Sequence, residues 1–282
     1  MTATAETFAS WLAEQGRATN TVGAYRRDVA AYLRWLSVRG RAVADVDEAL
    51  VGEYIGHLGD SRRSSSVARA VVALRAFHRW CSAAGWCAHD PSTAVDAPVV
   101  QRAGRATVDE SDVARVLAVT TGQGFEARRD RALVLVLYRC GVKATEAIAL
   151  DVRDVDVRRH RLRVDREGAR PRTVPLVPDV EAALAEWLGP LGRGRLDAGG
   201  SALFLNQRGQ RLTRQGLWLL CRTAGARAGL GGVLAPNDLR HACGHELALR
   251  GIESAQVASL LGHSGGAAPS REQLTEVGWG GE

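Results

Sequence analysis

The sequence predicts a mainly α-helical protein with a small β-hairpin or sheet, divided into two domains. Apolar residues recur at helical spacing along most of the 282-residue chain. A stretch that contains proline and has little periodicity follows residue 90, and two short strand-like runs flank a turn near residue 168. Since 46% of the residues are apolar, the chain is long enough for two separate cores.

Four helices are predicted before residue 98. They cover residues 8–15, 20–36, 46–58 and a segment that begins at Ser64, where three serines form a helix-start signal. In the second and fourth helices the apolar residues share one face and the arginines lie away from it. The first domain is therefore predicted to be a small helical bundle with basic outer faces. The arginines of these faces are Arg26, Arg27, Arg34, Arg69, Arg75 and Arg79.

The second domain is predicted to be mainly helical and to contain the hairpin. Residues 98–106 are expected to form a linker, and a helix-start signal follows it before a helix over residues 112–119. Residues 131–138 are apolar on all sides, which predicts a helix at the centre of a core. Strands are expected over residues 161–166 and 172–177. Later helices are expected over residues 180–188, 213–228, 238–250 and 254–261.

The chain is basic, with 37 lysines and arginines against 31 acidic residues and a formal charge of +6. Lys143 is the only lysine, so nearly all of the cations are planar guanidiniums that suit phosphate. A genome rich in G and C also favours arginine, and a solvated charged surface is an equally simple explanation. The charge therefore permits a nucleic acid partner without demanding one.

The cysteines and the apolar runs predict a cytoplasmic protein. None of the five cysteines forms a C-x-x-C pair, and all lie in apolar segments where buried thiols are usual. The longest apolar run, residues 132–138, is too short to span a bilayer, and the start of the chain lacks a leader pattern. His241 and His245 stand at helical spacing, but no third ligand is evident. We expect no membrane contact, metal or cofactor.

Three segments of the second domain carry a recognisable pattern. They contain Gly141-Val142-Lys143 with Glu146, Asn237-Asp238-Leu239-Arg240-His241, and Leu261-Gly262-His263-Ser264. Together, in this order and spacing after a helical first domain, they resemble the tyrosine recombinases, or integrases, of the Xer type. In the first segment a glutamate follows three residues after the position where the family has an arginine, the second is similar to the family's H-x-x-R box, and the third matches its L-G-H-S box with the preceding helix. Each pattern alone is weak, whereas their order and spacing are specific.

The resemblance implies a site that binds a DNA phosphate between fixed cations. In the family a tyrosine oxygen attacks the phosphodiester and a 5′ hydroxyl leaves, while two arginines, a hairpin lysine and two histidine-type residues assist. Arg240 and His263 match this set. Lys143 stands at the first arginine position, where it keeps the charge but loses the two-pronged geometry. Asn237 replaces a histidine, and Glu167 occupies the lysine position, with Arg166 and Arg170 close by.

The family's nucleophilic tyrosine has no counterpart. It is expected about nine residues after His263, where direct counting reaches Glu272 and a two-residue insertion places Leu274. All four tyrosines of the chain precede residue 139. Neither Glu272 nor Leu274 gives a transferable DNA ester. Ser270, Thr275 and Tyr138 are weak substitutes, because Tyr138 ends an apolar helix and is more simply a core residue.

By resemblance, residues 1–97 form a helical, SAM-like core-binding domain and residues 107–264 a tyrosine-recombinase catalytic-type domain. Residues 98–106 link them, and residues 265–282 form an atypical tail, either decayed or partner-binding. The resemblance implies that both domains contact double-stranded DNA, with a solvated surface as the alternative. The DNA-binding residues expected from it are Arg26, Arg27, Arg69, Arg75, Arg79, Arg166, Arg170 and Arg240.

The function expected from the sequence is DNA binding linked to site-specific recombination or integration, without cleavage by this chain alone. Its partners would be double-stranded DNA and either active recombinase subunits or further copies of the chain on DNA. Two alternatives stay open. One is a divergent active recombinase that uses Lys143, Arg240 and His263, and the other is a decayed gene product with a folded core and no DNA role.

Overall fold

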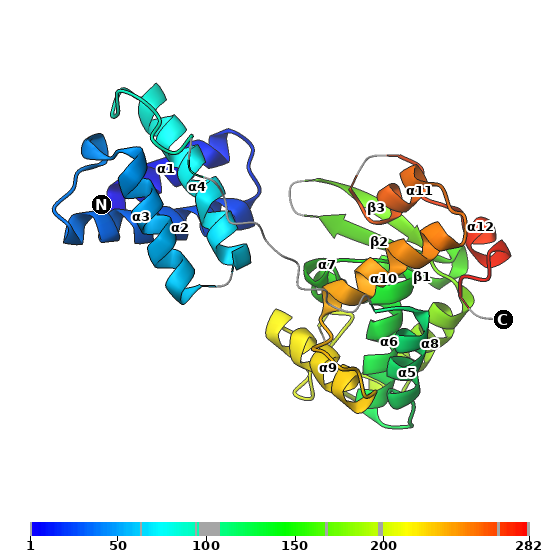
Figure 1. Ribbon diagram of the computed structural model, residues 1–282. Coiled ribbons are helices and arrows are strands. Elements are labelled where there is room, and N and C mark those ends of the chain that lie inside the picture. Colours follow the sequence, from blue (N-terminus) through cyan, green and yellow to red (C-terminus); the bar gives the residue numbers. More distant parts are fainter. Residues whose placement is uncertain are drawn as a thin grey trace. The chain divides into compact units, whose positions relative to one another are not determined.

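A computed structural model describes residues 2–62, 64–93, 95, 108–166, 169–196, 200–263 and 266–280. The chain divides into two compact units, residues 1–103 and 104–282, and each has its own apolar core (Figure 1). The predicted mainly helical fold with a small sheet is confirmed. The predicted linker, residues 98–106, lies largely outside the described residues. No helix among the described residues is both long and apolar enough to cross a membrane.

The first unit is a bundle of helices around an aromatic core. Phe8 packs edge-on against Phe77 at 5.4 Å between ring centroids, and the Tyr32 hydroxyl lies 3.1 Å from Nε2 of the buried His78. These contacts join the first, second and fourth helices, because each places its apolar face inward. The elements are α1 (Thr2–Glu14), α2 (Thr19–Val38), the 3₁₀ helix η1 (Val43–Asp45), α3 (Glu48–Ser61) and α4 (Ser64–Ala83).

The second unit is built around one buried helix, α6 (Phe125–Arg139). Residues 132–138 are almost completely inaccessible, as their uniformly apolar sequence predicts. Helices α8 and α10 contact α6 (Figure 1). The remaining helices are α5 (Glu110–Val119), α7 (Ala144–Ala149), α8 (Pro178–Leu188), α9 (Arg214–Arg227), α10 (Pro236–Leu249), α11 (Ser254–Leu260) and α12 (Arg271–Glu276), with 3₁₀ helices η2 (Val152–Asp154), η3 (Val157–Arg159) and η4 (Arg193–Leu196).

A three-stranded antiparallel sheet lies in the second unit. Its order is β1 (Val155–Asp156), β2 (Arg161–Arg166) and β3 (Ala169–Pro175). Leu162 of β2 pairs with Val174 of β3, and both side chains are buried. Because side chains alternate along a strand, this register turns Arg163 and Thr173 to the other face. The hairpin was predicted, whereas β1 is only two residues long and gives no sequence pattern.

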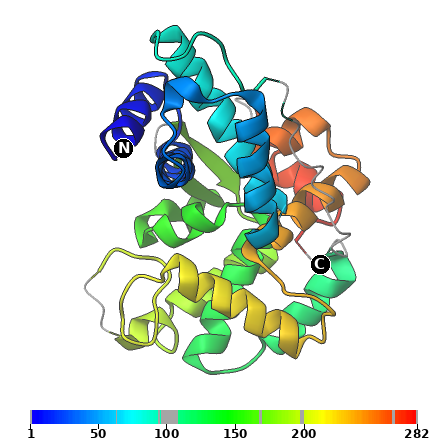
Figure 2. The same cartoon turned by 60° about the vertical axis from the view of Figure 1, so that its left-hand side comes forward.

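Residues 266–280 pack against the core of the second unit. Leu274 of α12 and Trp279 are fully buried. The indole Nε1 of Trp279 donates to the Arg139 carbonyl at 3.1 Å, and its ring lies 4.9 Å from the Tyr138 ring. Arg250 donates to the Val277 carbonyl at 2.7 Å. Figures 1 and 2 show α12 beside α10 and α11, so this segment closes one side of the unit.

The buried indole predicts a large contribution to stability. Trp279→Ala should lower the free energy of unfolding of the second unit by about 3–5 kcal/mol, because it removes a buried ring and leaves a cavity. Denaturant unfolding followed by circular dichroism measures the change. Trp218→Ala is the matched control, since Trp218 is 41% exposed, and it should change stability by less than about 1 kcal/mol. Equal effects of the two variants would contradict the packing described here.

Candidate phosphate-binding site

A tight turn after α6 brings the backbone of Gly141 against α10. Gly141 has a φ of +56°, a region that favours glycine, and a Cβ there would lie 2.6 Å from Leu261 Cδ2 and 3.0 Å from Cys243 Sγ. The Gly141 carbonyl accepts a hydrogen bond from Nη1 of Arg240 at 2.5 Å. A glycine is therefore required where the turn approaches Arg240.

Lys143 immediately precedes α7, two residues after this turn. Its backbone N–H donates to the Glu146 carboxylate at 2.8 Å, which satisfies one of the free amides at the start of the helix. The half-buried Lys143 side chain lies close enough to His263 to act on the charge of that imidazole. The short helix thus places the only lysine of the chain at the site.

Arg172 of β3 connects three elements at the site. Its two terminal nitrogens donate to the two oxygens of Glu146 at 2.9 and 2.8 Å, and Nε donates to the Leu260 carbonyl at 3.0 Å. Glu146 is buried, and burial alone would raise its pKa. The hydrogen bonds from Arg172 and from the Lys143 amide outweigh burial and hold the pKa of Glu146 below its usual range. Glu146 therefore stays ionised and fixes Arg172.

Gly262 makes room for that arginine. Its φ is +68°, and a Cβ would lie 2.9–3.2 Å from three atoms of the Arg172 guanidinium. Any larger residue would push Arg172 away from Glu146. The glycine of the L-G-H-S segment therefore serves both the turn after α11 and the packing of the ion pair.

Arg240 of α10 and His263 form the centre of the site. Arg240 is 5% exposed, and its Nη2 donates to the Leu261 carbonyl at 2.5 Å and lies 3.0 Å from Nε2 of His263. Because a guanidinium only donates, Nε2 of His263 must accept, which leaves the ring proton on Nδ1. The exposed His263 then presents an N–H donor, while Arg240 contributes a buried positive charge.

The charges around His263 are almost all positive. Burial lowers the pKa of His263, and the cations of Arg240, Lys143 and Arg172, together with His241, lower it further. Glu146 is the carboxylate of this group, and it is already bound by Arg172. The site therefore combines a neutral imidazole with three cations, which suits an oxyanion such as phosphate.

Asn237 pairs with its own helix. Its Nδ2 lies 2.8 Å from Nε2 of His241, one turn further along α10, and both side chains are exposed. An amide exchanges no proton, so Asn237 offers only hydrogen bonds at this edge of the site. His245 also lies on α10, but within the described ranges no group of three or more His, Cys, Asp or Glu side chains is placed to hold a metal.

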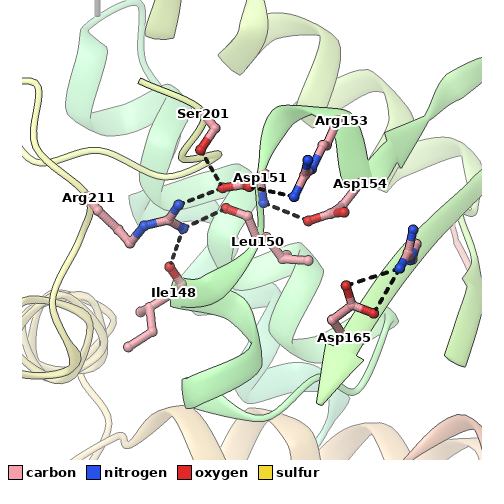
Figure 3. A network of polar contacts seen from close by, with 9 residues as sticks. Ile148, Leu150, Asp151, Arg153, Asp154, Asp165, Ser201 and Arg211 are labelled. Atoms are coloured by element: carbon pink, nitrogen blue, oxygen red, sulfur yellow. Dashed lines mark hydrogen bonds and ion pairs between the residues drawn. The ribbon is translucent and has the colours of Figure 1, made fainter. Parts of the chain in front are cut away.

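The far end of α7 is held by a second polar network (Figure 3). Nη1 of Arg211 donates to the carbonyls of Ile148 and Leu150 at 2.9 and 3.0 Å. Its Nη2 donates to Asp151 at 2.5 Å, and the Ser201 hydroxyl donates to the same carboxylate at 3.0 Å. These bonds satisfy the last carbonyls of α7. The six-residue helix is therefore fixed at both ends, which keeps Lys143 and Glu146 in place.

The hairpin residues are described only in part. Glu167, at the family's lysine position, lies outside the described residues. The backbone of Arg166 ends β2, and that of Arg170 lies in β3. Their contribution to the site remains a prediction.

The residues considered for the nucleophile position lie in or near α12, apart from Tyr138. Leu274 is fully buried, whereas Glu272 is exposed in the first turn of α12. Ser270 accepts from the Gln273 amide at 3.2 Å, and Thr275 donates to the Arg271 carbonyl at 3.1 Å. Tyr138 lies in the core, where burial raises the pKa of its hydroxyl.

The arginines predicted to bind DNA in the first unit have different environments. Arg26, Arg27, Arg69 and Arg79 are exposed, and Arg69 also binds the buried Asp28 at 2.9 Å. Arg75 is half-buried and donates to the Val95 carbonyl at 2.7 Å. Helical periodicity predicted that Arg75 lies on an outer face. It could not predict the hydrogen bond to Val95, because Val95 lies in a segment after α4.

In the sequence, Glu146 is part of the resemblance and Arg172 begins the second predicted strand, and neither is predicted to be a functional residue. The structure shows that they form the ion pair behind Lys143 and His263. Glu146 could have been predicted as a capping residue of α7, because it follows the residue before the helix by three positions. An acidic side chain at that position typically accepts a hydrogen bond from a backbone amide at the helix start. No local pattern predicts its partner, which lies 26 residues away.

Comparison with protein families matches most of the chain. Residues 106–268 match the phage integrase family, and residues 5–85 match the N-terminal SAM-like domain of phage integrases. The chain is 33% identical over 257 residues to tyrosine recombinase XerD of Staphylococcus epidermidis, covering 89% of this chain and 86% of that protein. It is 34% identical over 266 residues to tyrosine recombinase XerC of Herpetosiphon aurantiacus, and the match covers 92% of this chain and 86% of that protein.

Solved structures show the same fold at low sequence identity. The integrase of transposon Tn1549, in complex with transposon right end DNA, has a TM-score of 0.75 and 14% identity, covering 93% of this chain and 91% of that one. A XerH site-specific recombinase in a post-cleavage complex with its difH substrate has a TM-score of 0.70 and 18% identity, covering 91% and 78%. A lambda integrase dimer bound to a core site has a TM-score of 0.69 and 16% identity, and the match covers 93% of this chain and 94% of that one.

The cations around His263 lead to a prediction about its titration. Lys143→Gln should raise the pKa of His263, because a positive neighbour that disfavours the imidazolium is removed. Arg208→Gln, which removes a charge that does not act on His263, is the control and should leave the titration unchanged. NMR titration of the histidine side chains measures both. An unchanged or lower pKa for His263 in Lys143→Gln would contradict the charge arrangement.

Proposed function

We propose that this chain, which belongs to the phage integrase family, binds duplex DNA in site-specific recombination without cleaving it. Its relatives XerD and XerC are tyrosine recombinases. In this proposal the site at His263 holds a backbone phosphate. The chain acts as an inactive subunit or a competitor in the cytoplasm, where chromosomal DNA is its partner.

The observation that carries this proposal is the cationic group around His263. Arg240, Lys143 and Arg172 all act on the imidazole, and Arg172 binds the Glu146 carboxylate. Phosphate contacts position a protein on DNA, and arginine, lysine and backbone amides make most of them. The site therefore retains the electrostatic part of phosphate recognition.

In this proposal the chain lacks the residue that performs the covalent part of the reaction. A recombinase forms a bond between a tyrosine oxygen and phosphorus while the bond to the 5′ oxygen breaks. Counting from His263 reaches Glu272, and a two-residue insertion reaches the apolar Leu274, whose side chain is fully buried. Loss of one charge-stabilising donor costs a reaction about a hundredfold to a thousandfold, whereas loss of the nucleophile removes the covalent route.

Recombination by this chain would then require other subunits that supply tyrosine. The lambda integrase structure is a dimer on a core site, and the XerH structure contains a cleaved DNA substrate. Their fold is shared by this chain, so an assembly of several subunits on DNA is the arrangement we propose. Active subunits or further copies of the chain are its partners.

A divergent active recombinase is the second candidate. It is favoured by Arg240 and His263, which lie 3.0 Å apart between Nη2 and Nε2, and by Lys143, whose charge acts on His263. Such an enzyme would need a nucleophile from elsewhere in the chain, and it would become covalently attached to DNA. That attachment separates the two candidates.

An electrophoretic shift assay with duplex DNA from the protein's own locus, across a salt series, tests binding. We expect the logarithm of the affinity to fall linearly with the logarithm of the salt concentration, because bound phosphates release counterions. Lys143→Gln should make this slope shallower by about one unit, since one phosphate contact is lost. The absence of a shift even at low salt would contradict the proposal and favour a folded product without a DNA role.

A further inference from the structure

A wide hollow in the second unit lies between the start of α6 and one face of α9. Its volume is about 1010 Å³, which is large enough for a small organic molecule. The end of α5, the 3₁₀ helix η4 and the turn at residues 206–208 complete its walls. Its described lining residues include none of the cations around His263, so the hollow is separate from the phosphate-binding site.

The two carboxylates that line the hollow already have partners. Asp130 accepts from Nε of Arg129 at 2.7 Å, and this arginine is itself only 8% exposed. Glu126 accepts from the side-chain amide of Gln207 at 2.6 Å. Burial raises the pKa of Asp130, while the nearby cations of Arg129 and Arg227 oppose that effect. The hollow therefore has little uncompensated negative charge.

The remaining cations of the hollow are exposed guanidiniums from three different segments. Among the described residues no carboxylate forms an ion pair with Arg208 or Arg227. The start of α6 also lines the hollow, and Gly124 before it supplies no side-chain cap, so the positive end of the helix dipole adds to the charge. The lining thus favours a bound anion. The exposed arginines are Arg195, Arg208 and Arg227.

Part of the lining is apolar. Phe125 and Leu220 are buried, whereas Leu219 of α9 is 54% exposed at the hollow. A molecule with an apolar part would cover Leu219 and gain hydrophobic free energy. An inorganic anion would leave this surface in water. The lining therefore favours a molecule that carries both a negative charge and an apolar part.

We infer that the hollow is a binding site for an organic anion with an aromatic or aliphatic body. Arg208 and Arg227 bind its charged group, because a guanidinium offers paired N–H donors to carboxylate, phosphate or sulfonate oxygens. Leu219 and Phe125 contact its apolar part. This ligand is additional to DNA, and the inference does not depend on the proposed function.

A fluorescence titration of the full-length chain with anilinonaphthalene sulfonate tests the inference. This probe carries a sulfonate on an aromatic body, and it becomes strongly fluorescent in an apolar site. We expect saturable binding to the parent chain. Arg208→Gln and Arg227→Gln should each weaken binding by about tenfold, because a hydrogen bond to a charged group is lost.

Arg222→Gln is the matched control. Arg222 is an exposed arginine on the same helix as Arg227, but it does not line the hollow. Its replacement should change the dissociation constant by less than about twofold. Leu219→Asp should weaken binding as the arginine variants do, because it adds a negative charge and removes an apolar contact at an exposed position. Circular dichroism checks that each variant is folded.

Three results would overturn the inference. One is the absence of saturable binding to the parent chain. Another is an equal dissociation constant for Arg208→Gln, Arg227→Gln and Arg222→Gln, since the probe would then bind elsewhere. The third is displacement of the probe by duplex DNA, which would assign the hollow to the DNA-binding surface. The first two results would leave the proposed function intact.

Discussion

The site depends on one ion pair, in which the guanidinium of Arg172 meets both oxygens of Glu146 and also the Leu260 carbonyl. This contact joins β3, α7 and the end of α11, three elements that bring Lys143, Arg172 and His263 together. Both side chains are largely inaccessible, so removal of either partner would leave an uncompensated buried charge. Gly262 follows from the same constraint, because the guanidinium occupies the space that a larger residue would need.

The function that we propose separates phosphate binding from strand cleavage. Cations and a neutral imidazole surround the place that we propose for the phosphate, and Leu274, one of the two residues reached by counting from His263, is buried in the core. Fixed charges that bind a phosphate equally well before and during reaction give affinity without rate. We propose that the chain occupies a DNA site in this way while other subunits cleave the strands. The packing of Leu274 and Trp279 gives α12 a structural role in the second unit.

Sequence patterns predicted the parts of the fold that are determined by residues close together in the chain. The apolar run of α6, the amphipathic faces of α2 and α4 and the two strands of the hairpin all follow from neighbouring residues, and the structure confirms them. Helix α7 and strand β1 are too short to show a period, and distant partners such as Arg211 stabilise them. Residues 266–280 looked atypical because their anchors, among them the Arg139 carbonyl and the Tyr138 ring, lie more than a hundred residues away. Among the site residues, Arg240 and His263 were found by motif, whereas the partner of Glu146 needed the three-dimensional structure.

The central claim is that this chain holds DNA without becoming covalently attached to it. Intact-mass spectrometry of the protein, after incubation with a duplex nicked so that a cleaved strand cannot religate, measures this directly. An active Xer recombinase on its own nicked site serves as the positive control. Our account predicts that the mass of this chain stays unchanged under conditions in which the DNA is bound. A mass increased by that of a DNA strand would contradict it and would identify a nucleophile elsewhere in the chain.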